Sequence, residues 1–130
     1  MKKLLFVYAA LFLLNACDKD EAAPGIIGEW KLIEVLADPG DGSGHFRAVS
    51  SDKRITFMKD GTYSSTGFIC NFTLDAEETS HGSYTTTETG YQIACSETPG
   101  FSIDLQIEGG FLILSLPCIE PCLQKFRKLN

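Results

Sequence analysis

Positive charge is scarce in this chain of 130 residues, which carries 11 lysines and arginines against 17 aspartates and glutamates, a net charge of −6. Nucleic-acid binding needs clustered cations that displace counterions, so the composition argues against a nucleic-acid partner. The same deficit argues against adsorption to anionic lipid headgroups through a basic patch. We interpret the acidic balance as a source of solubility.

Long apolar runs are also scarce. The longest, residues 4–14, has 11 residues and is too short to cross a bilayer. It follows a basic start and has the layout of a secretory signal peptide. Its last four residues, Leu14-Asn15-Ala16-Cys17, resemble the lipobox of bacterial lipoproteins, which is cleaved before the cysteine. The resemblance implies that residues 1–16 are removed and that acyl chains on Cys17 anchor the protein in a membrane.

A run of charged residues, Asp18 to Glu21, follows the lipobox cysteine. It resembles the acidic tract of surface-exported lipoproteins in Bacteroidota, which implies an outer-membrane location with the protein facing outward. The alternative is a solvated tether without a sorting role. Residues 17–25 are therefore expected to be a lipidated tether, and residues 26–130 a single folded domain.

Helical periodicity is lacking throughout the domain, where short runs rich in β-formers alternate with turn residues. The pattern predicts eight strands, at residues 29–36, 54–58, 62–70, 82–87, 91–95, 101–107, 111–116 and 123–129. Eight consecutive antiparallel strands favour an all-β, up-and-down barrel, which leaves no exposed sheet edge. A β-sandwich is the alternative.

The predicted connections alternate in length. Those between strands 2–3, 4–5 and 6–7 are tight and contain glycine, whereas residues 37–53, 71–81, 96–100 and 117–122 form longer loops. In an up-and-down meander the long loops share one end of the barrel. The chain enters the first strand at the opposite end, so the long loops are predicted to point away from the membrane.

Gly28-Glu29-Trp30, together with Arg127 in the last strand, resembles the signature of the calycins. In lipocalins an arginine covers this tryptophan at the closed end of the barrel, which implies that Trp30 and Arg127 form a cation–π pair. The segments at residues 36–46, 117–122 and 126–129 resemble the lipocalin-like domain of Bacteroidota lipoproteins. The resemblance implies a calycin-like barrel that binds a small apolar molecule.

Aromatic residues are candidates for lining a ligand cavity in such a barrel, namely Phe57, Tyr63, Tyr84, Tyr91, Phe101 and Phe111. The alternative is that they fill the core, because eight strands enclose room for side chains or for one small ligand.

Four cysteines remain if Cys17 is acylated, and an even number in an exported protein indicates disulfides. All four fall at the predicted loop-bearing end. Three pairings are open, and we favour Cys70–Cys95 with Cys118–Cys122. The alternative is a metal or redox site that includes His45 or His81.

Catalytic patterns are absent, since no nucleophile motif surrounds the serines or histidines. The glycine-rich loop from Asp38 to Gly44 lacks the spacing of a calcium loop and is interpreted as a turn-rich loop. We therefore expect no enzyme activity, no cofactor and no metal. The function expected is that of a membrane-anchored binding protein with a small apolar ligand. The alternative is a surface structural or interaction protein that uses its disulfide-stapled loops to bind another protein.

Overall fold

The computed structural model describes residues 25–130. The predicted signal peptide, Cys17 and the acidic tract lie outside the described residues, and the assignments made for them stay predictions. Among residues 25–130 every regular element is a β-strand, and no helix there has the length and apolar character needed to cross a membrane.

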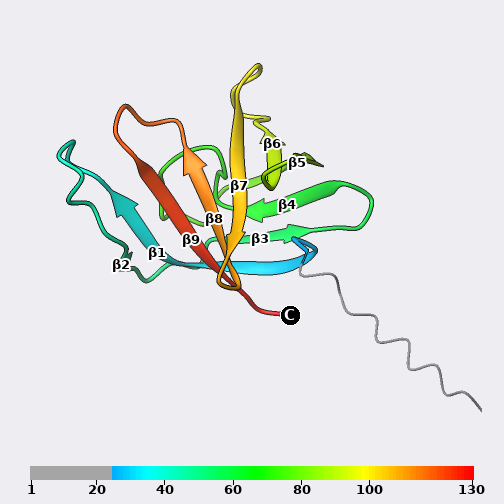
Figure 1. Cartoon of the computed structure of the whole chain (residues 1–130). Coiled ribbons are helices and arrows are strands. Elements are labelled where there is room, and N and C mark those ends of the chain that lie inside the picture. The colour runs from blue at the N-terminus through cyan, green and yellow to red at the C-terminus, as the bar shows by residue number, and fades with distance from the viewer. Residues whose placement is uncertain (1–24) are drawn as a thin grey trace, which may run out of the picture.

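Nine strands follow one another along the chain (Figure 1). They are β1 (Gly28–Ala37), β2 (Arg47–Ala48), β3 (Arg54–Phe57), β4 (Thr62–Thr66), β5 (Thr79–Thr86), β6 (Tyr91–Ala94), β7 (Ser102–Glu108), β8 (Phe111–Leu116) and β9 (Cys122–Lys128). From β3 to β9 each strand pairs antiparallel with the next in sequence.

The sheet closes because β1 pairs with β3 on one side and with β9 on the other. The seam with β9 runs from Trp30 opposite Lys128 to Ala37 opposite Cys122, with one register shift between Leu32 and Glu34. The prediction of an eight-stranded up-and-down barrel is confirmed, and a sandwich is excluded by the closure. The short β2 is an additional strand against the distal half of β1. This architecture is consistent with a lipocalin-like barrel.

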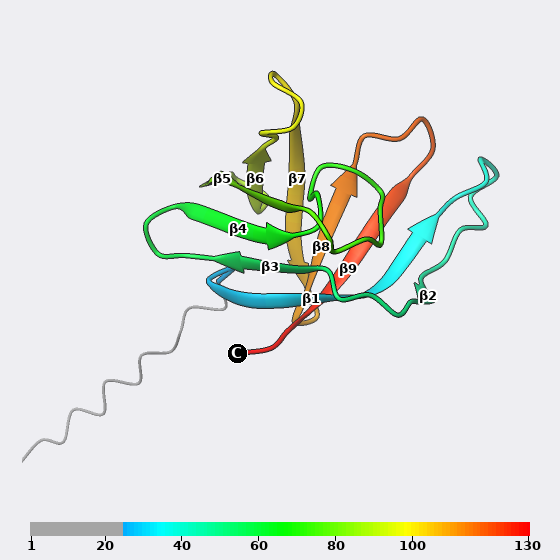
Figure 2. The same ribbon diagram turned by 180° about the vertical axis from the view of Figure 1, so that it is seen from behind.

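The asymmetry between the two ends is also confirmed. Tight turns join β3 to β4, β5 to β6 and β7 to β8 at what we call the closed end. The opposite, loop-bearing end carries residues 38–46, 67–78, 95–101 and 117–121. Figures 1 and 2 show the loops after β1, β6 and β8 projecting away from the β7–β8 turn and the C-terminus.

Two strand boundaries differ from the prediction by more than one residue. The expected third strand continues to Cys70, whereas β4 ends at Thr66. Gly67 has a positive φ of 80°, and a Cβ there would lie 2.1 Å from the carbonyl oxygen of Asp75. The chain therefore turns inward at Gly67, and β5 begins at Thr79 instead of Gly82.

The barrel interior is filled by side chains that alternate along the strands. Trp30, Phe57, Tyr63 and Phe126 are each at most 2% exposed. They pack with aliphatic residues from β1, β3 and β6 to β8 and with the two buried cysteines Cys95 and Cys122. Burying this much apolar surface is the main favourable contribution to folding.

The closed end is organised around Trp30. Its indole nitrogen donates a hydrogen bond to the carbonyl oxygen of Ile26 at 2.7 Å. Gly28, with a φ of 128°, lies so close to the C-terminus that a Cβ would meet the Asn130 carbonyl oxygen at 2.5 Å. The glycine and the tryptophan of the G-x-W motif thus both have a structural role.

The predicted cover for Trp30 is wrong by one residue. Lys128 places its ammonium 5.4 Å from the centre of the indole, whereas Arg127 is exposed on the outer wall opposite Lys31. Alternation along β9 explains the difference, because Gln124 and Phe126 face inward and Arg127 must therefore face outward. Lys128 reaches the indole from the end of the strand and donates a hydrogen bond to the Gly25 carbonyl.

Candidate functional site

Two disulfides staple the loop-bearing end, and both predicted pairings are confirmed. Cys70 bonds to Cys95 with Cα atoms 5.8 Å apart, and Cys118 bonds to Cys122 with Cα atoms 5.9 Å apart. The first joins the β4–β5 loop to the end of β6, and the second closes the β8–β9 turn. All four sulfurs are thereby committed to structure, and none is a free thiolate that could bind a metal.

The β4–β5 loop, residues 67–78, covers the mouth of the barrel, and we call it the mouth loop. Ile69 extends into the core and is fully buried. Side chains beneath the loop hold its backbone: Ser51 donates to the carbonyl of Leu74 at 2.6 Å, and Gln124 donates to that of Thr73 at 3.0 Å. The mouth loop is thus fastened from below.

Lys53 is the strongest of these fasteners. Its ammonium donates to the carbonyls of Asn71 and Thr73 and to the amide oxygen of Gln124, at 3.4, 3.2 and 3.1 Å. The side chain is fully buried. Burial lowers the pKa of Lys53 to about 8, and the charge of Glu97 partly offsets this effect. A lysine hydrogen-bonded in this way has a structural task, so we do not assign it a catalytic one.

Large apolar side chains are exposed on the loops around this mouth. Phe72 and Leu74 on the mouth loop are 37% and 41% exposed, Phe101 is 52% exposed and Ile119 is fully exposed. The amide of Cys95 donates to the carbonyl of Phe101 at 2.8 Å, and Cys95 is bonded to Cys70. The Cys70–Cys95 disulfide therefore keeps the segments that carry Phe72 and Phe101 close together.

The β1–β2 loop adjoins the same end and is held by Asp38. The two carboxylate oxygens of Asp38 accept hydrogen bonds from the amides of Gly40, Gly42 and Gly44 at 2.7, 3.1 and 2.8 Å. These donors lower the pKa of Asp38. Because the carboxylate is occupied by its own loop, the segment is a self-contained turn, as the sequence indicates.

Of the six aromatic residues predicted to line a ligand cavity, four come together inside the barrel and two lie elsewhere. Phe57 and Tyr63 are buried in the core, and the ring of Tyr84 meets that of Phe57 edge-on, with centroids 5.2 Å apart. Tyr91 lies beyond Tyr84, with centroids 6.3 Å apart. These four form an aromatic stack on β3 to β6 that fills the interior toward the closed end. For them the alternative interpretation holds, that aromatic side chains fill the core.

The other two residues are placed wrongly by the prediction. Phe101 precedes β7 and is exposed at the loop-bearing end, outside the barrel. Phe111 stands opposite Arg127 on the outer wall, where the Lys125 ammonium lies 5.4 Å from its ring. Neither can line an internal cavity.

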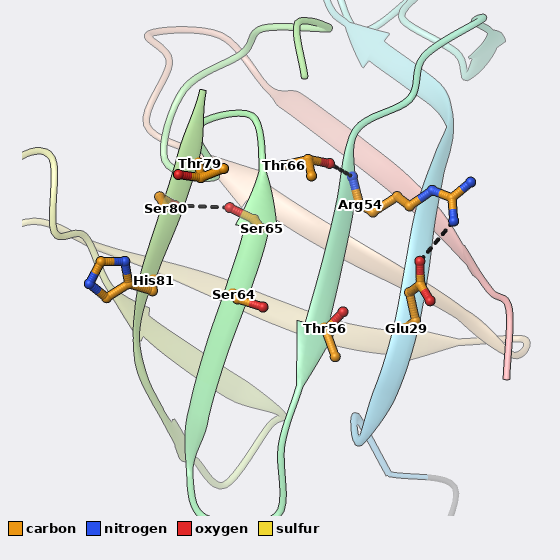
Figure 3. Close-up of a pocket in the computed structure, with 9 residues that line it drawn as sticks. All are labelled: Glu29, Arg54, Thr56, Ser64, Ser65, Thr66, Thr79, Ser80 and His81. Carbon is orange, nitrogen blue, oxygen red and sulfur yellow. Dashed lines mark hydrogen bonds and ion pairs between the residues drawn. The ribbon is translucent and has the colours of Figure 1, made fainter. Parts of the chain in front are cut away.

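A hollow of about 300 Å³ lies on the outer wall, across β1, β3, β4 and β5 (Figure 3). Its lining is mostly hydroxyl-bearing, and Arg54 and Glu29 form an ion pair at its edge at 2.8 Å. Figure 3 shows His81 on the opposite side of this hollow, apart from the ion pair. The charged groups satisfy one another and converge on no common point, so the hollow has no assembled acid, base and nucleophile.

Two of the hydroxyl-bearing residues that line this hollow, Ser65 and Ser80, are buried in the wall. Ser65 and Ser80 share a hydrogen bond of 2.9 Å, and Ser65 donates to the Gly67 carbonyl at 2.8 Å. The Tyr63 hydroxyl nearby is buried and has no hydrogen-bond partner among residues 25–130. Burial raises the pKa of Tyr63, which favours the neutral phenol. Residues 25–130 contain no group of three or more His, Cys, Asp and Glu side chains placed to hold a metal.

Sequence reasoning missed the polar residues that fasten the mouth loop. Lys53, Ile55 and Phe57 stand at every second position, so strand periodicity extended backward places Lys53 on the inner face. The same spacing from Phe126 places Gln124 inside. No local pattern indicates that these side chains would meet across the barrel.

In comparisons with known proteins, no family model, no curated protein and no solved structure matches the chain. A function must therefore be argued from its own sequence and structure.

Proposed function

We propose that this chain is a lipid-anchored envelope protein with a lipocalin-like barrel, which presents the loop-bearing end of that barrel to a protein partner. One observation carries the proposal. Exposed apolar side chains stand on loops that are stapled by disulfides and fastened from beneath, above a barrel interior filled by its own side chains. Rigid apolar anchors of this kind are typical of protein-binding surfaces.

Carriage of a small apolar ligand has less support. Its six predicted lining residues are divided among the core, the outer wall and a loop, and the mouth loop covers the route into the barrel. A binding role for the outside of the loops is therefore the better explanation of the same sequence features.

The tether supports the orientation that the proposal needs. Gly25, where the described residues begin, accepts a hydrogen bond from Lys128 at the closed end. An anchor at Cys17 would thus hold the closed end toward the membrane and the loops away from it. The resemblance of the acidic tract to that of surface-exported lipoproteins favours the outer face of the outer membrane.

The binding surface can be tested on intact cells that express the full chain with a photo-crosslinking amino acid at Phe72, Phe101 or Ile119. The matched controls carry the same amino acid at Ser64, Thr66 or Ser115, which are exposed on the strands. We expect defined protein adducts from the loop positions alone. Equal adducts from both sets, or none from the loops, would contradict the proposal.

The anchor is tested separately by labelling cells with an alkyne fatty acid. The wild-type chain is expected to incorporate the label and to fractionate with membranes, whereas Cys17→Ser abolishes both. A wild-type chain that takes up no label would refute the anchor and leave the loop surface as an independent question.

A further inference from the structure

We use the name mouth surface for the four exposed apolar residues on the loops at this end, Phe72, Leu74, Phe101 and Ile119. Phe72 and Leu74 flank Thr73, whose carbonyl is held by both Lys53 and Gln124. Ile119 is at the tip of the turn closed by Cys118 and Cys122. Because their backbones are fixed, these side chains lose little conformational freedom when they are covered, which makes them suitable anchors.

Every formal side-chain charge in the four loops around this surface is negative. The loops contain seven carboxylates and no lysine or arginine: Asp38, Asp41, Asp75, Glu77, Glu78, Glu97 and Glu120. All but Asp38 are exposed to solvent. Two ammonium groups reach these loops. That of Lys53 is buried beneath them, and that of Lys125 lies 4.1 Å from the centre of the Phe46 ring and pairs with Glu34 on the barrel wall. Arg47, on β2, is exposed and borders the β1–β2 loop. The remaining lysines and arginines of residues 25–130 lie on the other strands or on the closed-end turn after β3.

We propose that the mouth surface binds a basic polypeptide, whose apolar side chains cover Phe72, Phe101 and Ile119 while its lysines or arginines meet the surrounding carboxylates. This inference rests on the proposed function and names the chemistry of its partner. Interfaces commonly place apolar anchors at the centre and charges at the rim, and the rim charges select the partner by complementarity.

The same charges argue against the other occupants of an apolar surface. Carboxylates around the mouth would be repelled by anionic lipid headgroups, so insertion of the loops into a facing membrane is disfavoured. A second copy of this chain shares the net charge of −6, which opposes self-association. A cationic partner alone gains from both the apolar and the charged parts of the surface.

The test uses the full chain, purified in detergent and immobilised through a C-terminal tag at the closed end, as bait for a phage library of random peptides. The charge variant is Glu77→Gln, Glu97→Gln and Glu120→Gln. Its matched control makes the same change in charge at the closed-end turns, with Asp60→Asn, Glu88→Gln and Glu108→Gln. An apolar variant carries Phe72→Ser and Ile119→Ser. Retained disulfides and an unchanged Tm establish that each variant is folded.

We expect the enriched peptides to be net positive and to contain aromatic or aliphatic residues. Their affinity should fall roughly tenfold or more for the charge variant and stay unchanged for the control. The difference in peptide affinity between the wild type and the charge variant should become smaller when the salt is raised from about 0.05 to about 0.5 M, since salt screens exposed charges. The apolar variant should lose binding at both salt concentrations.

Three results would overturn the inference: enriched peptides of neutral or negative charge, no enrichment, or equal binding to the charge variant and the wild type. If binding survives the charge variant but is lost in the apolar variant, the loop surface of the proposed function stands and the basic partner does not. If neither variant changes binding, both fail. Self-association of the wild type that the charge variant abolishes, measured by light scattering, would assign the surface to a second copy instead.

Discussion

At the scale of single residues, Lys53 and Lys128 both have structural roles, but in different environments and through different interactions. Lys53 is fully buried and acts through hydrogen bonds to backbone carbonyls, whereas Lys128 is half-buried and covers an indole face from the end of β9. Strand alternation in the sequence predicts that Lys53 points inward. It does not predict that the ammonium meets the carbonyls of Asn71 and Thr73, which lie on a loop distant in sequence. The G-x-W motif correctly predicts that Trp30 organises the closed end. The motif does not indicate its cover, because the alternation along β9 turns Arg127 outward and brings Lys128 to the indole.

The stability of the fold is expected to depend on pH through Lys53. An unfolded lysine titrates near 10.5, whereas burial lowers the pKa of the folded residue to about 8. Below pH 8 both states are protonated; from about pH 8 to 10.5 the unfolded chain binds more protons, so the folded state becomes more stable as the pH rises. The gain is on the order of 3 kcal/mol at most.

This dependence is measured as the difference in urea-unfolding free energy between the wild type and Lys53→Met across pH 7 to 11. The raised pKa values of Tyr63 and Tyr84 act in the opposite direction above pH 10, but they are common to both proteins and cancel in the difference. A difference that stays flat with pH would show that Lys53 titrates at its ordinary value.

The lysine cover of the indole gives a second expectation. Lys128→Ala should destabilise the fold by about 1 kcal/mol, because it removes the contact with Trp30 and the hydrogen bond to Gly25. Arg127→Ala, on the outer wall, is expected to change stability by less than about 0.5 kcal/mol. Fluorescence of Trp30, the one tryptophan in the chain, reports both unfolding curves and the altered environment of the indole. The reverse order of effects would restore the arginine as the cover.

At the scale of elements, the strands were predictable and the loops were not. Alternation defines β7 from Ile103 and Leu105, and Asp60-Gly61 marks the turn between β3 and β4. The two-residue β2 is too short to leave a pattern. The sequence predicts a strand for the first part of the mouth loop, because the inward turn at Gly67 depends on a close approach to Asp75 that no local pattern indicates.

The two disulfides should contribute unequally to stability. In the chain-entropy account, Cys70–Cys95, with a sequence separation of 25, stabilises by about 3.5 kcal/mol and Cys118–Cys122, with a separation of 4, by about 2 kcal/mol. We expect Cys70→Ser with Cys95→Ser to lower the Tm more than Cys118→Ser with Cys122→Ser. The loss should be accompanied by faster amide hydrogen exchange in the mouth loop. Slow exchange there after removal of Cys70–Cys95 would mean that Lys53, Ser51 and Gln124 hold the loop alone.

At the scale of the whole molecule, the main property is the closure of the sheet into a barrel. Eight consecutive strands predict this closure, and the pairing of β1 with β9 shows it. β1 pairs with β9 for most of its length, so neither strand offers a free edge there. The candidate site is also a property of this scale. Its apolar and acidic residues come from separate loops, and the sequence placed these loops at one end through their lengths alone. What it could not show is that the mouth loop would cover the barrel and turn Phe72 and Leu74 outward.

Removal of the last strand should therefore abolish the fold. A chain that stops after Pro121 lacks β9, exposes the edges of β1 and β8, and loses the buried side chains of Gln124 and Phe126. We expect it to aggregate when expressed, whereas a chain that stops after Lys128 remains soluble and cooperative, since it loses only the hydrogen bond from Leu129 to Glu29 within the described sheet. Circular dichroism and gel filtration distinguish the two. A monomeric, folded product without β9 would contradict the dependence on closure.

The position of β1 has a mechanical consequence. This strand starts beside Gly25 at the closed end and runs to the loop-bearing end, with β9 on one side along most of its length and β3 and β2 on the other. A pulling force applied between the N-terminal segment and the loops would be directed along β1. The hydrogen bonds that flank the strand lie perpendicular to that direction, so they would be loaded together in shear instead of being opened one at a time. The barrel is thus built to transmit tension along its first strand.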